Sequence, residues 1–133
     1  MSDTLSKTGV IAIVDDDEPL CEALGSVMKA AGFSTVTFAS AEEYLDSANR
    51  KDSMCLILDV RLPGMSGIEL QRRLLDTNSQ VPIIFVTAHG DAPLRDLVIK
   101  AGAAGFLNKP VRSDMLLKEI HAALQKTGTN KHP

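Results

Sequence analysis

The sequence predicts an α/β fold, a doubly wound parallel sheet of five strands with helices on both faces. Two observations carry this prediction. Along the 133 residues, five short strand-like runs alternate with five segments of helical character. Most of the runs are continuously apolar and bounded by turn residues, which is typical of strands buried on both faces of a parallel sheet. The connections are only a few residues long, so a single domain with right-handed crossovers is expected.

The composition excludes several classes of protein. A hydrophobic content of 44% rules out wholesale disorder, and a net charge of −3 provides no basic field for nucleic acid or an anionic membrane. The polar residues 1–7 lack the apolar core of a signal peptide, and no apolar run approaches the roughly 20 residues of a membrane span. Cys21 and Cys55 are expected to be free thiols in a reducing compartment, which favours a cytoplasmic location.

The first half of the chain is expected to form two strand–helix pairs. Residues 10–14 are a β-branched apolar run, and the acidic residues after it lead to Pro19 at the start of a helix that Gly32 ends. Residues 34–38 are less apolar, which suits a strand near the edge. Ser40 then begins a short helix, with a glutamate three residues later at the spacing of a capping box.

The second half begins with residues 54–58, an apolar run that leads directly into Asp59 and a turn rich in Pro and Gly. The other elements expected are a helix at 66–76, a strand at 81–86, a helix at 92–101 with Gly102 as its C-cap, a strand at 103–107 and a helix at 113–126. The inward positions expected on the third and fifth helices are Ile68, Leu70, Leu74, Leu75, Met115, Leu116, Ile120, Ala123 and Leu124. The domain is predicted to span 8–127, between flexible tails at 1–7 and 128–133.

Polar side chains follow four of the five strands. They are Asp15 and Asp16 after the first strand, Asp59 after the third, Thr87 after the fourth and Lys109 after the fifth. Because the carboxyl ends of parallel strands meet at one edge of the sheet, we expect these side chains to converge. Carboxylates crowded in this way repel each other by about 4 kcal/mol per pair at roughly 4 Å and an effective dielectric near 20. The cluster therefore requires compensating cations.

Lys109 is one such cation and a divalent metal is the other. Ligands that are all oxygen favour Mg²⁺ over zinc or copper. In this setting Asp59 is suited to attack a phosphoryl donor and form an acyl phosphate. The metal, Lys109 and the hydroxyl of Thr87 would stabilise the charge on the oxygens of the transferred group.

These motifs together resemble the receiver domain of bacterial two-component response regulators over about residues 8–126. The resemblance is carried, in order and at the family's spacing, by Val14-Asp15-Asp16, by Leu58-Asp59-Val60-Arg61-Leu62-Pro63-Gly64-Met65-Ser66-Gly67, by Thr87-Ala88 and by Lys109-Pro110. It implies a flavodoxin-like (βα)5 fold with strand order 2-1-3-4-5. It also implies a signalling domain that accepts and loses a phosphoryl group, not an enzyme with substrate turnover.

The resemblance also assigns roles to individual residues. It implies that Asp59 is the phosphoacceptor, that Asp15, Asp16, Asp59 and the backbone carbonyl of Arg61 bind Mg²⁺, that Thr87 and Lys109 contact the phosphoryl group, and that Thr87 and Phe106 act as the switch. The Lys109-Pro110 bond is expected to be cis. The run 89–93 further resembles receivers of the nitrogen-fixation type, which usually carry a DNA-binding helix-turn-helix domain.

The implied partners follow from that family. A sensor histidine kinase or a phosphotransfer protein would supply the phosphoryl group, and phosphorylation would change partner binding or produce a homodimer. DNA would be contacted only through an output domain that this chain does not contain, and no membrane contact is expected. A stand-alone receiver that acts through a protein partner is the alternative to the receiver part of a transcriptional regulator.

Plainer interpretations stand beside these assignments. Asp15 and Asp16 could serve only to cap the helix that follows them. Thr87 could be an ordinary hydroxyl at the end of a strand, and Lys109 could be a solvated lysine before a turn. For His89 the plain interpretation, a solvated loop residue, is preferred. Even so, His89 and Arg61 each lie two residues past a reactive position, and their bulk suggests the hypothesis of a long-lived phosphoryl group.

Two other functions share this fold or chemistry. A magnesium-dependent phosphatase of the haloacid dehalogenase type also uses an aspartate at a strand end as its nucleophile. Such a phosphatase carries a second aspartate two residues later, where this chain has Arg61. It also usually has a cap insertion, for which this chain has no room. A flavin-binding protein of this fold needs a phosphate-binding loop rich in glycine and hydroxyl residues after the first strand, and this sequence lacks such a loop there. The acidic residues at 15–17 would repel a cofactor phosphate there.

Overall fold

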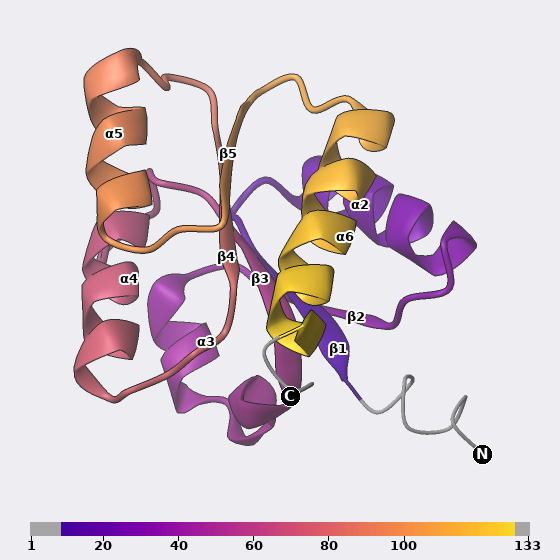
Figure 1. Cartoon of the computed structure of the whole chain (residues 1–133), viewed down its shortest axis with the longest axis horizontal. Coiled ribbons are helices and arrows are strands. Elements are labelled where there is room, and N and C mark those ends of the chain that lie inside the picture. The colour runs from indigo at the N-terminus through magenta and orange to yellow at the C-terminus, as the bar shows by residue number, and fades with distance from the viewer. Residues whose placement is uncertain (1–8, 130–133) are drawn as a thin grey trace.

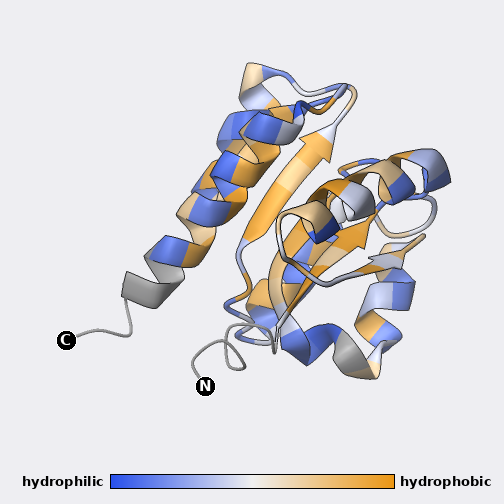
Figure 2. Ribbon diagram, turned by 90° about the vertical axis from the view of Figure 1, so that its right-hand side faces the viewer, coloured by the Kyte–Doolittle hydropathy of each residue, from blue (hydrophilic) through white to orange (hydrophobic). Residues whose placement is uncertain are grey.

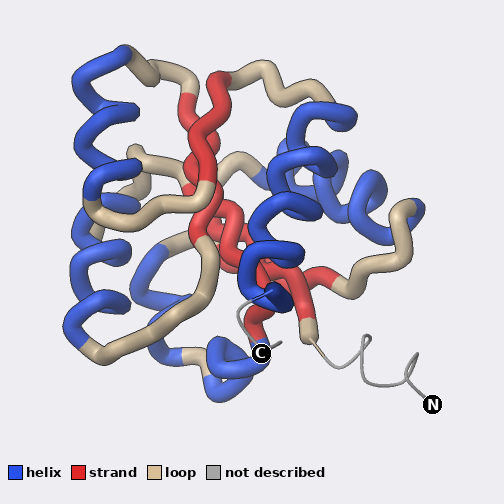
Figure 3. Tube along the Cα trace, in the orientation of Figure 1, coloured by secondary structure: helices blue, strands red, loops and turns tan. Residues whose placement is uncertain are grey.

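A parallel five-stranded sheet forms the centre of the computed structural model, which describes residues 9–129 (Figures 1 and 3). The strands are β1 (Val10–Val14), β2 (Thr35–Phe38), β3 (Ser53–Leu58), β4 (Ile83–Thr87) and β5 (Gly105–Asn108). They lie in the order β2-β1-β3-β4-β5, and every neighbouring pair is parallel. The predicted fold class and strand order are confirmed.

Helices cover both faces of this sheet. They are α2 (Glu18–Ala30), α3 (Ala41–Asp46), α4 (Gly67–Asp76), α5 (Ala92–Lys100) and α6 (Ser113–Thr129), with a short 3₁₀ helix η1 (Ala48–Asp52) after α3. Figure 1 shows α3, α4 and α5 on one side of the sheet and α2 and α6 on the other. Each strand–helix connection therefore crosses over the sheet, which brings the carboxyl ends of all five strands to one edge.

The hydrophobic core consists of two layers, one on each face of the sheet. Successive side chains along a strand point to opposite faces, so Ile11 and Ile13 face α2 and α6, whereas Ala12 and Val14 face the other three helices. Figure 2 shows the resulting apolar strands. Burying one such side chain fully contributes about 1.5–3 kcal/mol, and burial on both faces explains why these strands read as continuous apolar runs.

Four of the five helices begin at a capping side chain. Leu20 N donates to Asp17 Oδ1, Glu43 N to Ser40 Oγ, Glu69 N to Ser66 Oγ and Leu94 N to Asp91 Oδ1, at 2.9–3.1 Å. Such caps stabilise a helix by about 1 kcal/mol each. The capping box predicted at Ser40 is close to the one observed, in which Glu43 accepts from the amide of Ala39. These caps define where four of the five strand-to-helix loops at the carboxyl edge of the sheet end.

The structure corrects the predicted helix faces at two positions. Leu75 and Met115 were expected inside, but they are 49% and 42% exposed. Each lies one residue, about 100° of helical rotation, from a residue that packs on the sheet. Gln71 is buried instead, and its amide Nε2 donates to Val98 O of α5 at 3.1 Å.

Element boundaries also differ from the prediction near the C-terminal end of the domain. The last helix, α6, continues to Thr129, so residues 128 and 129 are helical instead of part of a tail, and η1 is an additional element. The tail predicted at 1–7 and the remaining predicted tail residues, 130–133, lie outside the described residues. Among the described residues, no helix combines the length and apolarity needed to cross a membrane.

Candidate functional site

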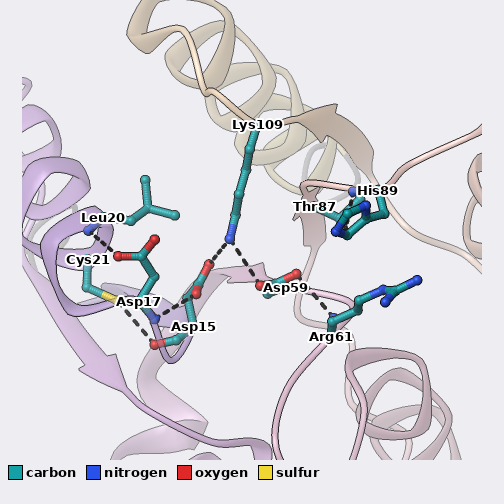
Figure 4. A network of polar contacts seen from close by, with 9 residues as sticks. All are labelled: Asp15, Asp17, Leu20, Cys21, Asp59, Arg61, Thr87, His89 and Lys109. Carbon is teal, nitrogen blue, oxygen red and sulfur yellow. Dashed lines mark hydrogen bonds and ion pairs between the residues drawn. The ribbon is translucent and has the colours of Figure 1, made fainter.

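Figure 4 shows four of the polar residues predicted at strand ends together at the carboxyl edge of the sheet: Asp15, Asp59, Thr87 and Lys109. Asp15 and Asp59 directly follow the adjacent strands β1 and β3, and Asp59 N donates to Val14 O at 3.1 Å. Thr87 is the last residue of β4, and Lys109 directly follows β5. Lys109 N donates to Thr87 O at 2.9 Å, which continues the pairing of these two strands into the site.

Three carboxylates gather at this edge. Asp15, Asp16 and Asp59 each present an oxygen, and these oxygens lie within 4.8 Å of one another. Asp15 and Asp59 are only 5% and 6% exposed, whereas Asp16 is exposed. The residue that caps α2 is Asp17, not Asp15 or Asp16. Capping of α2 therefore does not account for Asp15 and Asp16.

Lys109 is the cation that the carboxylates share. Its Nζ lies 2.9 Å from Asp15 Oδ2 and 3.1 Å from Asp59 Oδ2. Burial by itself would lower the pKa of Lys109, but the hydrogen bonds to Asp15 and Asp59 outweigh that effect and raise the pKa above its ordinary value. The ammonium group is therefore fully charged at neutral pH.

Backbone amides hold the other oxygen of each buried carboxylate. Asp17 N donates to Asp15 Oδ1 at 3.0 Å, and Arg61 N donates to Asp59 Oδ1 at 3.2 Å. Burial raises the pKa of Asp15, and the hydrogen bonds from Lys109 and Asp17 oppose that rise. Each carboxylate is thus oriented by one amide and one ammonium, which fixes the direction of its oxygens.

The oxygen-only cluster matches a hard divalent cation such as Mg²⁺. Asp15, Asp16 and Asp59 are the described side chains that would hold the ion. One lysine charge among three carboxylates leaves a net negative site, which a divalent ion would neutralise. The donor chemistry therefore fits the expected metal.

Thr87 belongs to β4 and Phe106 to β5, which lie on the far side of β3 from β1, the strand that Asp15 follows. Thr87 is 1% exposed, and its Oγ1 accepts a hydrogen bond from His89 N at 3.4 Å. Phe106 is partly buried against the core layer under α3, α4 and α5. The Lys109-Pro110 peptide bond is cis, as the resemblance implied.

The ring of Phe106 sits against Gly90, a contact that the sequence did not indicate. A Cβ added to Gly90 would lie 2.6 Å from the Cε2 and Cζ atoms of the ring and 2.5 Å from Asn108 Oδ1. Gly90 therefore makes room for the ring. A glycine between a strand end and a capped helix was the only local signal for this contact.

The two cysteines are buried and free, in agreement with the prediction of thiols. Cys21 Sγ donates to Asp15 O at 3.4 Å. Burial raises the pKa of Cys21 to about 11 and that of Cys55 to about 12. Both thiols are therefore protonated at neutral pH, and neither is a nucleophile in the site.

Comparison with known proteins gives consistent matches. Residues 11–121 match the family model of the response regulator receiver domain. Response regulator protein TodT of Pseudomonas putida is 48% identical over 125 residues, which cover 94% of this chain and 54% of TodT. Transcriptional regulatory protein FixJ of Bradyrhizobium diazoefficiens is 36% identical over 122 residues, which cover 92% of this chain and 60% of FixJ.

A solved structure supports the same relationship. The structure of the response regulator StyR is similar with a TM-score of 0.84 and 41% sequence identity, over 93% of this chain and 63% of the StyR chain. This chain spans a little over half the length of the curated relatives that it matches.

Proposed function

This chain belongs to the response regulator receiver domain family, and from that premise we propose that it is a switch activated by phosphorylation of Asp59. One observation carries the proposal. Lys109 bridges Asp59 and Asp15 at 3.1 and 2.9 Å, within a cluster of three carboxylates at the carboxyl edge of the sheet. This arrangement combines a nucleophile, a fixed cation and a set of metal ligands.

In the proposed reaction, a carboxylate oxygen of Asp59 forms a bond to the phosphorus of a phosphohistidine. The phosphorus–nitrogen bond breaks, and the imidazole of the donor leaves with that electron pair and takes a proton from solvent. Lys109 and the hydroxyl of Thr87 stabilise the charge on the phosphoryl oxygens. Mg²⁺, when held by the three carboxylates and the carbonyl of Arg61, supplies further charge neutralisation. A histidine kinase or a phosphotransfer protein is the donor.

The signal leaves through the switch residues. A phosphoryl group on Asp59 draws the Thr87 hydroxyl toward it, which breaks the weak contact of 3.4 Å with His89 N and frees the loop that carries Gly90. Phe106 rests on that loop, so the ring and the loop move together. The result is a two-state element that a local change of charge biases.

The surface that we propose to respond consists of α5, β5 and α6. Large apolar side chains are exposed there: Leu97 is 55% exposed, Met115 42% and Ile99 38%. Exposed apolar side chains of this size are typical of surfaces that bind a partner. The partner is a second phosphorylated copy or another protein.

The output that we propose is transcriptional. TodT and FixJ are each longer than this chain, and FixJ is a transcriptional regulatory protein. On this basis the chain is the receiver part of such a regulator, and DNA is contacted only by a separate output domain. A stand-alone receiver that acts through a protein partner is the second candidate, and the cytoplasmic location stays a prediction.

The phosphatase of the haloacid dehalogenase type receives no support from the site. Such enzymes use a carboxylate two residues after the nucleophile as a general acid. That position holds Arg61, whose backbone amide binds Asp59 and whose side chain carries no carboxyl group. We therefore propose a phosphoacceptor without turnover of a separate substrate.

The test is uptake of labelled phosphoryl group from acetyl phosphate in the presence of Mg²⁺. Wild type and an Asp46→Asn control, which changes an exposed aspartate of α3, should take up label, and Asp59→Asn should take up none. Labelling of Asp59→Asn at the wild-type rate contradicts the proposal. Steady hydrolysis of a generic phosphate ester by the wild type would favour the phosphatase.

A further inference from the structure

The loop between β3 and α4, residues 59–66, is held by a side chain from another element. Met65 N donates to Glu42 Oε2 of α3 at 2.9 Å, across 23 residues of sequence. Asp59, the first residue of the loop, binds Val14 of β1 and Lys109, and at the other end the hydrogen bonds are local: Gly67 N donates to Val60 O, and Ser66 Oγ accepts from Glu69 N. Glu42 therefore anchors the middle of the loop from outside.

Gly64 is shaped to admit this carboxylate. Its φ of +74° lies in the left-handed region that favours glycine, and a Cβ at this position would lie 2.6 Å from Glu42 Oε2. The carboxylate is the far end of a flexible side chain, so an added methyl group would displace Glu42 instead of breaking the backbone. The glycine thus serves both the turn and the contact.

The electrostatics agree with an ionised, accepting Glu42. The hydrogen bond from Met65 N is the main reason why the pKa of Glu42 is lower than its ordinary value. Glu42 is exposed and is not a member of the carboxylate cluster, which consists of Asp15, Asp16 and Asp59 among the described residues. Its effect on the site has to pass through the loop.

We propose that Glu42 is a positioning residue that orients the β3–α4 loop and thereby presents Asp59 and the carbonyl of Arg61 to Mg²⁺. The inference rests on the proposed function, because it takes that site as the metal site. Arg61 N binds Asp59 Oδ1, so a shift of the loop changes both the carbonyl of Arg61 and the orientation of Asp59. Groups that orient metal ligands typically change metal affinity by about 10–100-fold when removed. Glu42 binds Met65 of the loop and not a metal ligand directly, so a smaller change in affinity is expected.

The experiment measures the Mg²⁺ dissociation constant by calorimetry, without a phosphoryl donor, for the wild type and three variants. Glu42→Ala should raise the constant by about three- to tenfold. Glu42→Gln loses the same charge but keeps an acceptor oxygen, so its constant should stay within about twofold of wild type. Glu43→Ala removes the neighbouring carboxylate of the same helical turn, which accepts from Ala39 and not from the loop, and should have no effect.

These variants separate orientation from charge. Equal weakening in Glu42→Ala and Glu42→Gln would mean that only the charge of Glu42 attracts Mg²⁺, and it would overturn the proposal. So would an unchanged constant in Glu42→Ala. Hydrogen exchange of the Met65 amide in metal-free protein gives a second readout, which should be faster in Glu42→Ala and unchanged in Glu43→Ala.

A glycine pair provides an independent check. Gly64→Ala should weaken Mg²⁺ binding as Glu42→Ala does, because it displaces the carboxylate. Gly32 has a φ of +94° and no atom within 4 Å of an added Cβ, so Gly32→Ala imposes backbone strain alone and should leave the Mg²⁺ constant unchanged. Equal effects of both substitutions would overturn the proposal. Failure of the wild type to bind Mg²⁺ would overturn it too, whereas Mg²⁺ binding without labelling of Asp59 would refute only the phosphoacceptor function.

Discussion

Replacing Lys109 with methionine should destabilise the metal-free protein and at the same time tighten its binding of Mg²⁺. Lys109 is the single ammonium group that contacts the clustered carboxylates among the described residues, at 2.9 Å from Asp15 and 3.1 Å from Asp59. Methionine keeps most of the length of the side chain and removes the charge. Asp15, Asp16 and Asp59 would then repel one another without a compensating cation.

The magnitude follows from the distances. At an effective dielectric near 20, each contact of Lys109 with a carboxylate is worth about 5.5 kcal/mol, and each repulsion between carboxylates whose oxygens lie within 4.8 Å of one another costs at least about 3.5 kcal/mol. The two attractions are therefore of the same order as the three repulsions. Removing one partner of a buried ion pair costs about 3–5 kcal/mol in measured cases. Because Lys109 is 18% exposed and water can enter the edge, we expect a loss of about 2 kcal/mol.

Mg²⁺ should restore most of that loss, since it supplies the missing positive charge. If the deficit falls from about 2 to about 0.6 kcal/mol in saturating Mg²⁺, the thermodynamic cycle requires that Mg²⁺ bind the variant about tenfold more tightly. The assay is urea unfolding at pH 7.5, in EDTA and in Mg²⁺, followed by circular dichroism because the chain has no tryptophan. Calorimetry measures the Mg²⁺ affinity directly.

Lys118→Met, which changes an exposed lysine of α6, is the matched control and should behave as wild type in both conditions. An equal loss of stability for Lys109→Met with and without Mg²⁺ would refute the electrostatic reasoning, because the lysine would then act through packing. Weaker Mg²⁺ binding by Lys109→Met would refute it as well.

Three further outcomes are expected. Gly90→Ala should lower the free energy of unfolding by about 1–3 kcal/mol, because the added methyl group would displace the Phe106 ring. The double variant Gly90→Ala with Phe106→Leu should recover part of that loss. Because burial raises the pKa of Cys55 from its ordinary value of 9.0 to about 12, this thiol should make stability fall above pH 9, by on the order of 1 kcal/mol at pH 10, and Cys55→Ala should lack this component of the pH profile. If the bulk of Arg61 and His89 protects the phosphoryl group, Arg61→Ala and His89→Ala should lose label from Asp59 faster, and unchanged lifetimes in both variants would end that hypothesis.

The sequence was sufficient for the fold because its determinants are local. Continuous apolar runs mark strands that are buried on both faces, and capping residues mark the first turn of four of the five helices. Strand ends then place Asp15, Asp59, Thr87 and Lys109 at one edge. The four side chains were identifiable because parallel strands in a doubly wound sheet share a direction.

Tertiary structure decided the features that depend on how helices pack. Leu75 and Met115 have the apolar character of core residues, yet the rotation of their helices leaves them exposed. Gln71 is buried because a carbonyl of α5 happens to lie within 3.1 Å of its amide. Periodicity resolves a helix face only to within about one residue, or 100°. The periodicity of apolar residues also does not show which residues of another helix a side chain will contact.

The same distinction divides the site. The sequence by itself determined which residues line the edge, since each follows a strand. Only the tertiary structure showed that Glu42 binds the loop after Asp59 and that Gly90 receives the ring of Phe106. Both contacts join segments that are well separated along the chain, and the distance between such segments depends on the packing of the whole domain. The spacing of residues along the sequence does not predict that distance.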